Sequence, residues 1–277
     1  MPEAASRASL TALAPGVYAW LEEPHCIGRP NAGVVVDEDG ATVVDTLMVP
    51  SQAARLAAAV SDLGRPVPRV VLTSGHIEFA GGTSHFRLAA VYGSALTSAH
   101  LDQPPNIEAY KAFMPKFGEE FEGLETRPVS HVVDSPVMLT PAVEVIPIGG
   151  HTPGNLMVRV PAAGVLFAGG MCSFGVTPLA FQGDPAAWAQ ALSAVADLAE
   201  TIVPGHGPVG GSAQVQELQA YLVACVEADG EVSAIPAGPW DGWADRHLDA
   251  INVERAHLLS RGEDRIPSSM LRAIGSE

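Results

Sequence analysis

The sequence of 277 residues contains little cysteine and no long apolar run. Its three cysteines, Cys26, Cys172 and Cys225, are scattered and odd in number, which argues against a disulfide framework or a cysteine-based zinc site. We therefore expect a reducing, cytoplasmic environment. No window reaches the roughly 18 consecutive apolar residues that a membrane span needs, so we expect a soluble protein with no membrane partner.

Positive charge is also scarce. The formal net charge is −16, and the only lysines are Lys111 and Lys116. An acidic surface of this kind repels phosphate backbones and anionic membranes. We therefore expect no nucleic-acid partner and a small-molecule substrate, although the charge does not indicate its chemistry, because acidic surfaces also keep proteins in solution.

Length and composition predict one domain over residues 1–277, because a chain that is 47% hydrophobic can bury a large core. Residues 1–15 contain one arginine and no long apolar run, which indicates a polar N-terminal arm more than a secretory signal. Residues 101–130 are expected to be a lid segment or part of the core, and residues 230–277 are expected to form a C-terminal loop and helix.

Short β-rich runs and helical patterns occur in both halves of the chain. We expect strands at 16–20, 31–36, 41–45, 67–72, 89–92, within 132–148, and at 156–160 and 165–167. We expect helices at 50–63, 185–200, 213–228 and 247–260. This distribution predicts an α+β protein in which two sheets pack face to face with helices outside, an αβ/βα four-layer sandwich.

Four glycine-containing stretches follow expected strands. They read Thr-Ser-Gly-His-Ile-Glu-Phe-Ala-Gly-Gly at 73–82, Gly-His-Thr-Pro-Gly-Asn at 150–155, Leu-Phe-Ala-Gly-Gly at 166–170 and Pro-Gly-His-Gly-Pro at 204–208. Their order and spacing resemble the metallo-β-lactamase superfamily, whose loops run Thr-His-x-His-x-Asp-His-x-Gly-Gly, Gly-His-Thr-Pro-Gly-Asp, Phe-x-Gly-Asp and Pro-Gly-His-Gly. The resemblance covers nearly the whole chain and implies the four-layer sandwich of that superfamily.

The resemblance also implies where metal ions would bind. In the family the first loop gives two histidines to one metal, and an aspartate and a histidine to a second. Those positions are here Ser74 and His76 for the first metal, and Glu78 and Phe79 for the second. The bridging aspartate position is Gly170. The resemblance therefore implies a dinuclear site that has lost several ligands.

Two further ligand positions are retained, since His151 matches the third ligand of the first metal and His206 matches a ligand of the second. We expect His76, His151, His206 and perhaps the longer Glu78 side chain to converge on at most one divalent ion, and these donors suit Zn²⁺, Fe²⁺ or Mn²⁺. The alternative is a metal-free site, because the ring of Phe79 fills space where a ligand and its water would lie.

Two classes of function follow. With one metal, the protein would hydrolyse an ester, thioester or lactone of a small apolar substrate, and Glu78 or His206 would move the proton. Without a metal, Glu78 would be a general base for isomerisation, elimination or cyclisation, or the pocket would only bind a ligand. Ser74 beside His76 is a third catalytic candidate, as a nucleophile; its alternative is an ordinary turn residue.

Apolar side chains recur at helical spacing over residues 106–121, at Ile107, Tyr110, Phe113, Phe117 and Phe121. One interpretation is a helix that packs this stripe on the core. The other is a lid in which Tyr110, Phe113 and Phe117 contact an apolar substrate.

Three other expectations concern single residues. By the resemblance, Phe79 and Cys172 contact the substrate, and Cys172 lies at the pocket floor; its alternative is a small buried apolar group. Asp45 resembles the family's buried aspartate that braces the first loop, and its alternative is a turn cap.

An apolar patch on the C-terminal helices would make a homodimer, whereas packing on the chain's own core is equally common.

Overall fold

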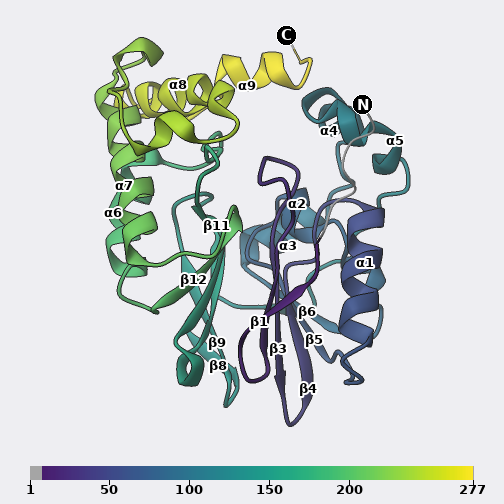
Figure 1. Cartoon of the computed structure of the whole chain (residues 1–277). Helices are drawn as coiled ribbons and strands as arrows, with labels where there is room; N and C mark the ends of the chain where they lie inside the picture. Colours follow the sequence, from purple (N-terminus) through teal and green to yellow (C-terminus); the bar gives the residue numbers. More distant parts are fainter. Residues whose placement is uncertain (1–7, 277) are drawn as a thin grey trace.

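Two sheets pack face to face, with helices on their outer faces, in the computed structural model, which describes residues 8–276 (Figure 1). The first sheet has the strand order β1 (Leu10–Ala14), β2 (Val17–Trp20), β3 (Ala32–Asp37), β4 (Gly40–Val44), β5 (Arg69–Val71), β6 (Ala90–Gly93) and β7 (His131–Val132). The second has the order β12 (Thr201–His206), β11 (Val165–Ser173), β10 (Asn155–Val160), β9 (Val143–Ile148) and β8 (Val137–Thr140). The predicted α+β sandwich is confirmed.

The side chains along each strand of the first sheet point alternately to its two faces, and both faces are buried. On β3, Val35 packs in the core between the sheets, while Val34 packs in the core beneath helix α1 (Pro50–Ser61). The same division holds on β4, where Val44 joins the first core and Val43 the second. Because successive side chains of a strand point to opposite faces, these runs of valine supply both layers.

The second sheet contributes large side chains to the core between the sheets. Phe167 of β11 lies against Gly33 of β3, where a β carbon would overlap its ring, so glycine allows the two sheets to approach. On the outer face, helices α6 (Pro185–Val195) and α7 (Ser212–Glu227) bury Trp188 and Tyr221 completely. Residues of β11 therefore face both cores.

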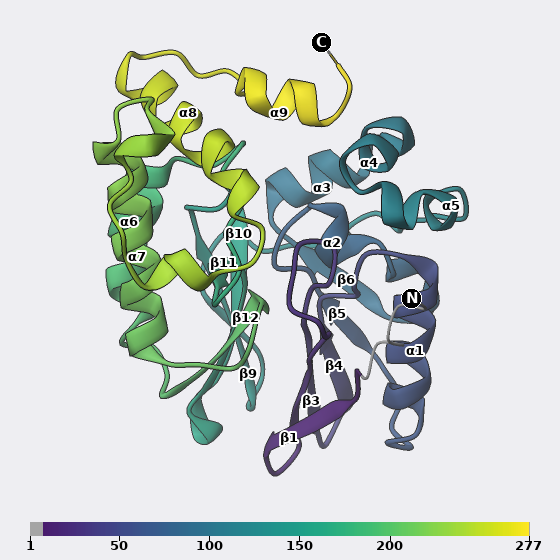
Figure 2. The ribbon, with the colours of Figure 1, turned by 45° about the horizontal axis from the view of Figure 1, so that its top comes forward.

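Short helices and two C-terminal helices lie at one end of the sheets (Figure 2). Helices α2 (Ile77–Ala80) and α3 (Ala95–Leu101) follow β5 and β6. Helices α4 (Ile107–Phe113) and α5 (Gly118–Phe121) lie beyond the first sheet, and α8 (Asp249–Ser260) lies beyond the second, with α9 (Ser268–Ala273) extending from that side toward α4. Within residues 8–276, no helix has the length and hydropathy to cross a membrane.

Two expected segments differ from the sequence prediction. Residues 1–7 of the expected N-terminal arm lie outside the described residues, but residues 10–14 of it form β1, paired antiparallel with β2. Gly16 at φ 74° permits the turn between these strands. The stripe over 106–121 is not one helix, because Pro115, which lacks an amide proton, follows Met114, the C-cap residue of α4.

Candidate active site

The four glycine-containing stretches meet at one end of the two sheets. His76 is the N-cap residue of α2, just beyond β5, and His206 is the last residue of β12. His151 lies in the loop between β9 and β10, and Gly170 lies within β11. The three imidazoles and Glu78 are therefore brought to one region from three separate parts of the chain, since His76 and Glu78 share the first stretch.

Glu78 and His206 form one buried pair. The Nε2 atom of His206 lies 3.4 Å from Oε1 of Glu78, and the side chains of His206 and Glu78 are only 9% and 10% exposed. The same Oε1 atom accepts a hydrogen bond of 2.7 Å from the backbone N–H of Gly28. Glu78 thus reaches a loop 50 residues away in the sequence, and two protein groups hold its carboxylate.

The two members of this pair stabilise each other's charged form. Burial would raise the pKa of Glu78, but His206, the Gly28 amide and His76 bring that pKa below its ordinary value. Burial would lower the pKa of His206, but Glu78, the backbone of Arg29 and the charge of Asp245 raise it above its ordinary value. The contact therefore favours the carboxylate form of Glu78 and the imidazolium form of His206.

His76 and His151 form a second pair. Their rings meet edge to face with centroids 4.6 Å apart. Burial lowers the pKa of both, and the positive charges of His76 and His206 lower that of His151 further. His76 Nε2 lies 2.8 Å from Oε1 of Gln182, and since a carbonyl oxygen only accepts, His76 donates there. These two imidazoles are neutral at neutral pH.

The ring of Phe79 contacts one histidine of each pair. Its centroid is 6.2 Å from that of His151 and 6.0 Å from that of His206, and the side chain is 1% exposed. The sequence indicated that this ring would occupy the space of a ligand. In the structure it is packed beside the two histidines and lines neither of the cavities described below.

The donor set does not fit the dinuclear centre that the resemblance implies. A β carbon at Gly170 would overlap Nδ1 and Cε1 of His151, so the imidazole fills the place from which a bridging carboxylate would extend. Ser74 is fully buried, and its hydroxyl accepts a 3.2 Å hydrogen bond from the amide of His76. Among residues 8–276, no three His, Cys, Asp or Glu side chains are grouped so as to hold a metal ion.

Asp45 lies directly behind the first loop. It is 2% exposed, and it accepts hydrogen bonds from the backbone N–H of Thr73 at 2.7 Å and from the Thr73 hydroxyl at 2.8 Å. Burial raises the pKa of Asp45 to about 8 despite these two hydrogen bonds. Its contacts are those of a residue that braces the loop carrying Ser74 and His76.

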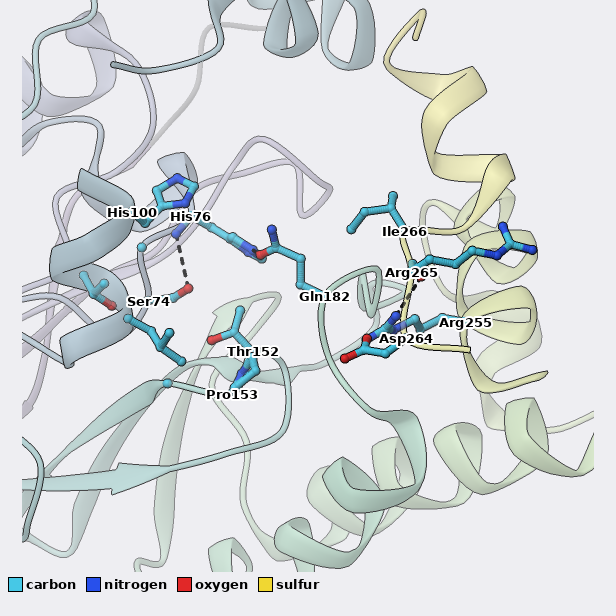
Figure 3. A pocket seen from close by; sticks show the side chains of 14 residues that line it. Ser74, His76, His100, Thr152, Pro153, Gln182, Arg255, Asp264, Arg265 and Ile266 are labelled. Atoms are coloured by element: carbon cyan, nitrogen blue, oxygen red, sulfur yellow. Dashed lines mark hydrogen bonds and ion pairs between the residues drawn. The ribbon is translucent and has the colours of Figure 1, made fainter. Parts of the chain in front are cut away.

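Two cavities adjoin the imidazoles. The first, of about 240 Å³, has largely apolar walls and includes His76 and Glu78. The second, of about 390 Å³, is more polar and includes Ser74 and His76 (Figure 3). Both cavities also include His100 and Gln182. His76 and its hydrogen-bond partner Gln182 therefore lie where the two cavities meet.

Only some of the residues that the sequence predicts to bind substrate line a cavity in the structure. Tyr110 and Phe113 line the apolar cavity. Phe117 packs instead in a core cluster with Met48, and its ring lies where a β carbon of Gly28 would be. Cys172 is fully buried in the core beneath α6 and α7 and lines neither cavity, and burial raises the pKa of its thiol.

Several residues of this region were not indicated by the motifs. Gln182 and Phe181 belong to the segment between β11 and α6, and the ring of Phe181 stacks on His76 with centroids 5.2 Å apart. Gly28 supplies an amide to Glu78. A sequence signal existed only for Gly28, as part of the Gly-Arg-Pro-Asn turn that precedes β3.

Comparison with known proteins gives one family. The sequence model described as the metallo-beta-lactamase superfamily matches residues 27–206. The metallo-beta-lactamase FIM-1 from Pseudomonas aeruginosa, in its mono-zinc form, is 23% identical with a TM-score of 0.61, covering 83% of this chain and 97% of its own. A metallo-beta-lactamase from Erythrobacter litoralis is 24% identical with a TM-score of 0.58, covering 76% and 96%. One from Hirschia baltica is 21% identical with a TM-score of 0.59, covering 78% and 97%.

Proposed function

Since the chain belongs to the metallo-β-lactamase superfamily but divides its histidines and Glu78 into two pairs, we propose that it catalyses proton transfer without a metal ion. The substrate is a small molecule with an uncharged reacting group, and the reaction is an isomerisation, elimination or cyclisation. The observation that carries this proposal is the contact between Glu78 and His206, in which protein groups supply the positive charge that a metal would otherwise supply.

Glu78 is the base in this proposal. Both of its close polar contacts involve Oε1, and the residue lines the apolar cavity, so Oε2 is the oxygen that accepts the substrate proton. His206 stabilises the carboxylate before the transfer and can return a proton afterwards, because its pKa is raised by the same contact. Arg29 and Asp245 hold His206 in its charged form.

His76 and Gln182 stabilise the charge that develops on the substrate. The Gln182 carbonyl oxygen is occupied by His76, so its amide nitrogen remains a donor at the place where the cavities meet. Gln182 and Glu78 line the same cavity, so a substrate carbonyl bound by that nitrogen would have its adjacent carbon in the cavity that Glu78 lines. Removing a proton from that carbon places negative charge on an oxygen that already has a donor.

A metallohydrolase is the second candidate. It is favoured by the contact of His76 with His151, which resembles two ligands of one ion, and by the mono-zinc form of one solved relative. A single Zn²⁺, Fe²⁺ or Mn²⁺ ion would require His206 or Glu78 to join that pair past the ring of Phe79. Its substrate would be an ester, thioester or lactone.

Hydrogen exchange into ketones tests the proposal. The protein, purified without an affinity metal and dialysed against EDTA, is incubated in D₂O with a series of methyl ketones from 2-butanone to 2-octanone, and deuterium at the α carbon is followed by NMR. We expect exchange above the buffer rate in wild type, and a loss of about 100-fold or more in Glu78→Gln, the range that removal of a general base costs.

Glu227→Gln is the matched control, because Glu227 is exposed at the end of α7. This variant should catalyse deuterium exchange into the ketones at the rate of wild type. Metal content is measured on the same samples by elemental analysis. No exchange above buffer with any ketone, or exchange that EDTA abolishes and Zn²⁺ restores, would overturn the metal-free proposal. Stoichiometric metal with hydrolysis of esters would instead establish the second candidate.

A further inference from the structure

The apolar cavity lies between two helices that are far apart in the sequence, α4 and α9. Tyr110 and Phe113 of α4 form one side, and Met270 and Ile274, at α9, form the other. Phe113 packs with both the cluster around α4 and the cluster around α9. The two helices therefore enclose one cavity beside Glu78, and the family match, which ends at residue 206, does not include α9.

The second cavity is more polar than the first, although most of its wall is apolar, and we call it the polar cavity. Two arginines line it, and both are paired with carboxylates, since Arg265 donates to Glu263 at 3.2 Å. The guanidinium of Arg255 donates to Asp264 at 2.8 Å and to the carbonyl oxygens of Gly183 and Arg265. Figure 3 shows Arg255 and Asp264 on the side of this cavity away from His76. The other polar walls include the hydroxyls of Ser74 and Thr152, which recognise uncharged donors and acceptors.

From these two cavities we propose that the substrate is neutral and has two parts. An apolar chain or ring occupies the space between α4 and α9, and an uncharged hydrogen-bonding group, such as an amide or hydroxyl, extends into the polar cavity. The reacting group lies between them, beside His76, Glu78 and Gln182. This inference rests on the proposed function, because it names the substrate of the same site.

Size and charge support each half of the proposal. The apolar cavity, at about 240 Å³, is smaller than the roughly 300–1,000 Å³ of pockets that enclose a whole drug-sized ligand, so it takes one group of the substrate. Arg255 is already neutralised by Asp264, and the net charge of the chain is −16. An anionic group in the polar cavity would therefore lose its hydration without gaining a counter-ion.

Binding of unreactive amides tests the inference separately from catalysis. Affinities of butanamide, hexanamide and octanamide are measured by calorimetry or by chemical-shift perturbation, with octanoate as the anionic comparison. We expect affinity to rise about fourfold for each added methylene, the factor that corresponds to its burial, and octanamide to bind at least tenfold more tightly than octanoate. Equal or tighter binding of octanoate would overturn the neutral substrate.

Two variants test the location. Ala109→Trp and Ile274→Trp fill the apolar cavity from its two sides, since both residues line it, and each should weaken octanamide at least tenfold while changing butanamide little. Ala99→Trp is the control, because Ala99 is exposed on α3 and lines neither cavity. Thermal unfolding verifies that each variant folds. Because there are two variants, the location of the apolar part of the substrate can still be tested if one of them does not fold. Unchanged octanamide affinity in a folded variant would overturn the location.

The two proposals fail in different ways. If amide affinity rises with chain length but no ketone exchange is detected, the proposal of proton transfer is overturned, and the apolar cavity remains a binding site. If ketone exchange occurs but its rate does not depend on chain length and is unchanged in Ala109→Trp, the proposal of proton transfer stands and that of a two-part substrate is overturned.

Discussion

Gly170 lies directly against the imidazole of His151, so that a β carbon at this position would overlap two atoms of the ring. Both residues are buried, and the ring also packs against Trp188 with centroids 5.5 Å apart. The position that carries a bridging carboxylate in the family has therefore become a contact surface for a histidine. Among the positions that the resemblance assigns to the two metals, position 170 therefore supplies no ligand.

Gly170→Ala should lower the free energy of unfolding by about 1–3 kcal/mol, because the added methyl group overpacks a buried position. Urea denaturation followed by circular dichroism measures the loss. Gly242→Ala is the control, since a β carbon at Gly242 meets nothing within 4 Å, and it should change stability by less than about 0.5 kcal/mol. Equal stability of the two variants would contradict the packing of His151 against Gly170.

Phe79→Ala should lower the free energy of unfolding by about 3–5 kcal/mol, since a buried aromatic ring is replaced by a void. Phe79 is 1% exposed, whereas Leu88 is 98% exposed, so Leu88→Ala is the control and should lose less than about 0.5 kcal/mol. Both are measured by urea denaturation at pH 7. A loss below about 1 kcal/mol in Phe79→Ala would mean that the ring is not packed beside the two histidines.

Much of the fold could be predicted from the sequence, because valine-rich runs and glycine loops report local structure. The β4 and β5 strands and the helix from Pro50 follow from alternation and from a proline that fits a first helical turn. The helical spacing over 106–121 was misleading in one respect. The stripe is divided at Pro115, so Tyr110 and Phe113 face the cavity while Phe117 packs in the core.

The site could be predicted less completely, since its decisive contacts join distant parts of the chain. Glu78 is longer by one methylene than the family aspartate, but no sequence pattern indicates that it meets Gly28, 50 residues away. Gln182 meets His76 across 106 residues, and α9 reaches the cavity from the end of the chain. Such contacts depend on tertiary packing, which periodicity does not report.

Asp45 makes stability depend on pH in a defined direction. Its pKa is about 8 in the folded protein, against an ordinary value of 3.8. Between these values the unfolded chain binds fewer protons than the folded one, so the free energy of unfolding falls as pH rises from about 4 to about 8. The stability contributed by the protonated carboxyl is complete below the unfolded value and lost above the folded value.

Asp45→Asn should remove this decline. Asparagine tolerates the φ of 61° at this position, and its amide can bond both the amide and the hydroxyl of Thr73. Between pH 4 and pH 9 the wild type should lose stability relative to the variant, on the order of a few kcal/mol. Denaturation curves at unit steps of pH measure the difference, and parallel curves for the two proteins would show that Asp45 is ionised in the folded state.

Glu78→Gln should reverse the direction of the pKa shift at His206. In the wild type, burial lowers the pKa of His206, but the charge of Glu78 and its hydrogen bond outweigh burial and raise that pKa above its ordinary value. Glutamine keeps the size of the side chain and removes the charge, so burial becomes the dominant influence, and the pKa of His206 falls below its ordinary value.

The measurement is an NMR titration of the imidazole carbons of His206 between pH 5 and pH 9 in wild type, Glu78→Gln and the surface control Glu227→Gln. We expect wild type and control to titrate together, and Glu78→Gln to titrate at lower pH. A His206 resonance that does not titrate in the wild type until EDTA is added would indicate a bound metal. An unchanged pKa in Glu78→Gln would show that the contact between Glu78 and His206 is not an ion pair, which would remove the basis for metal-free proton transfer at this site.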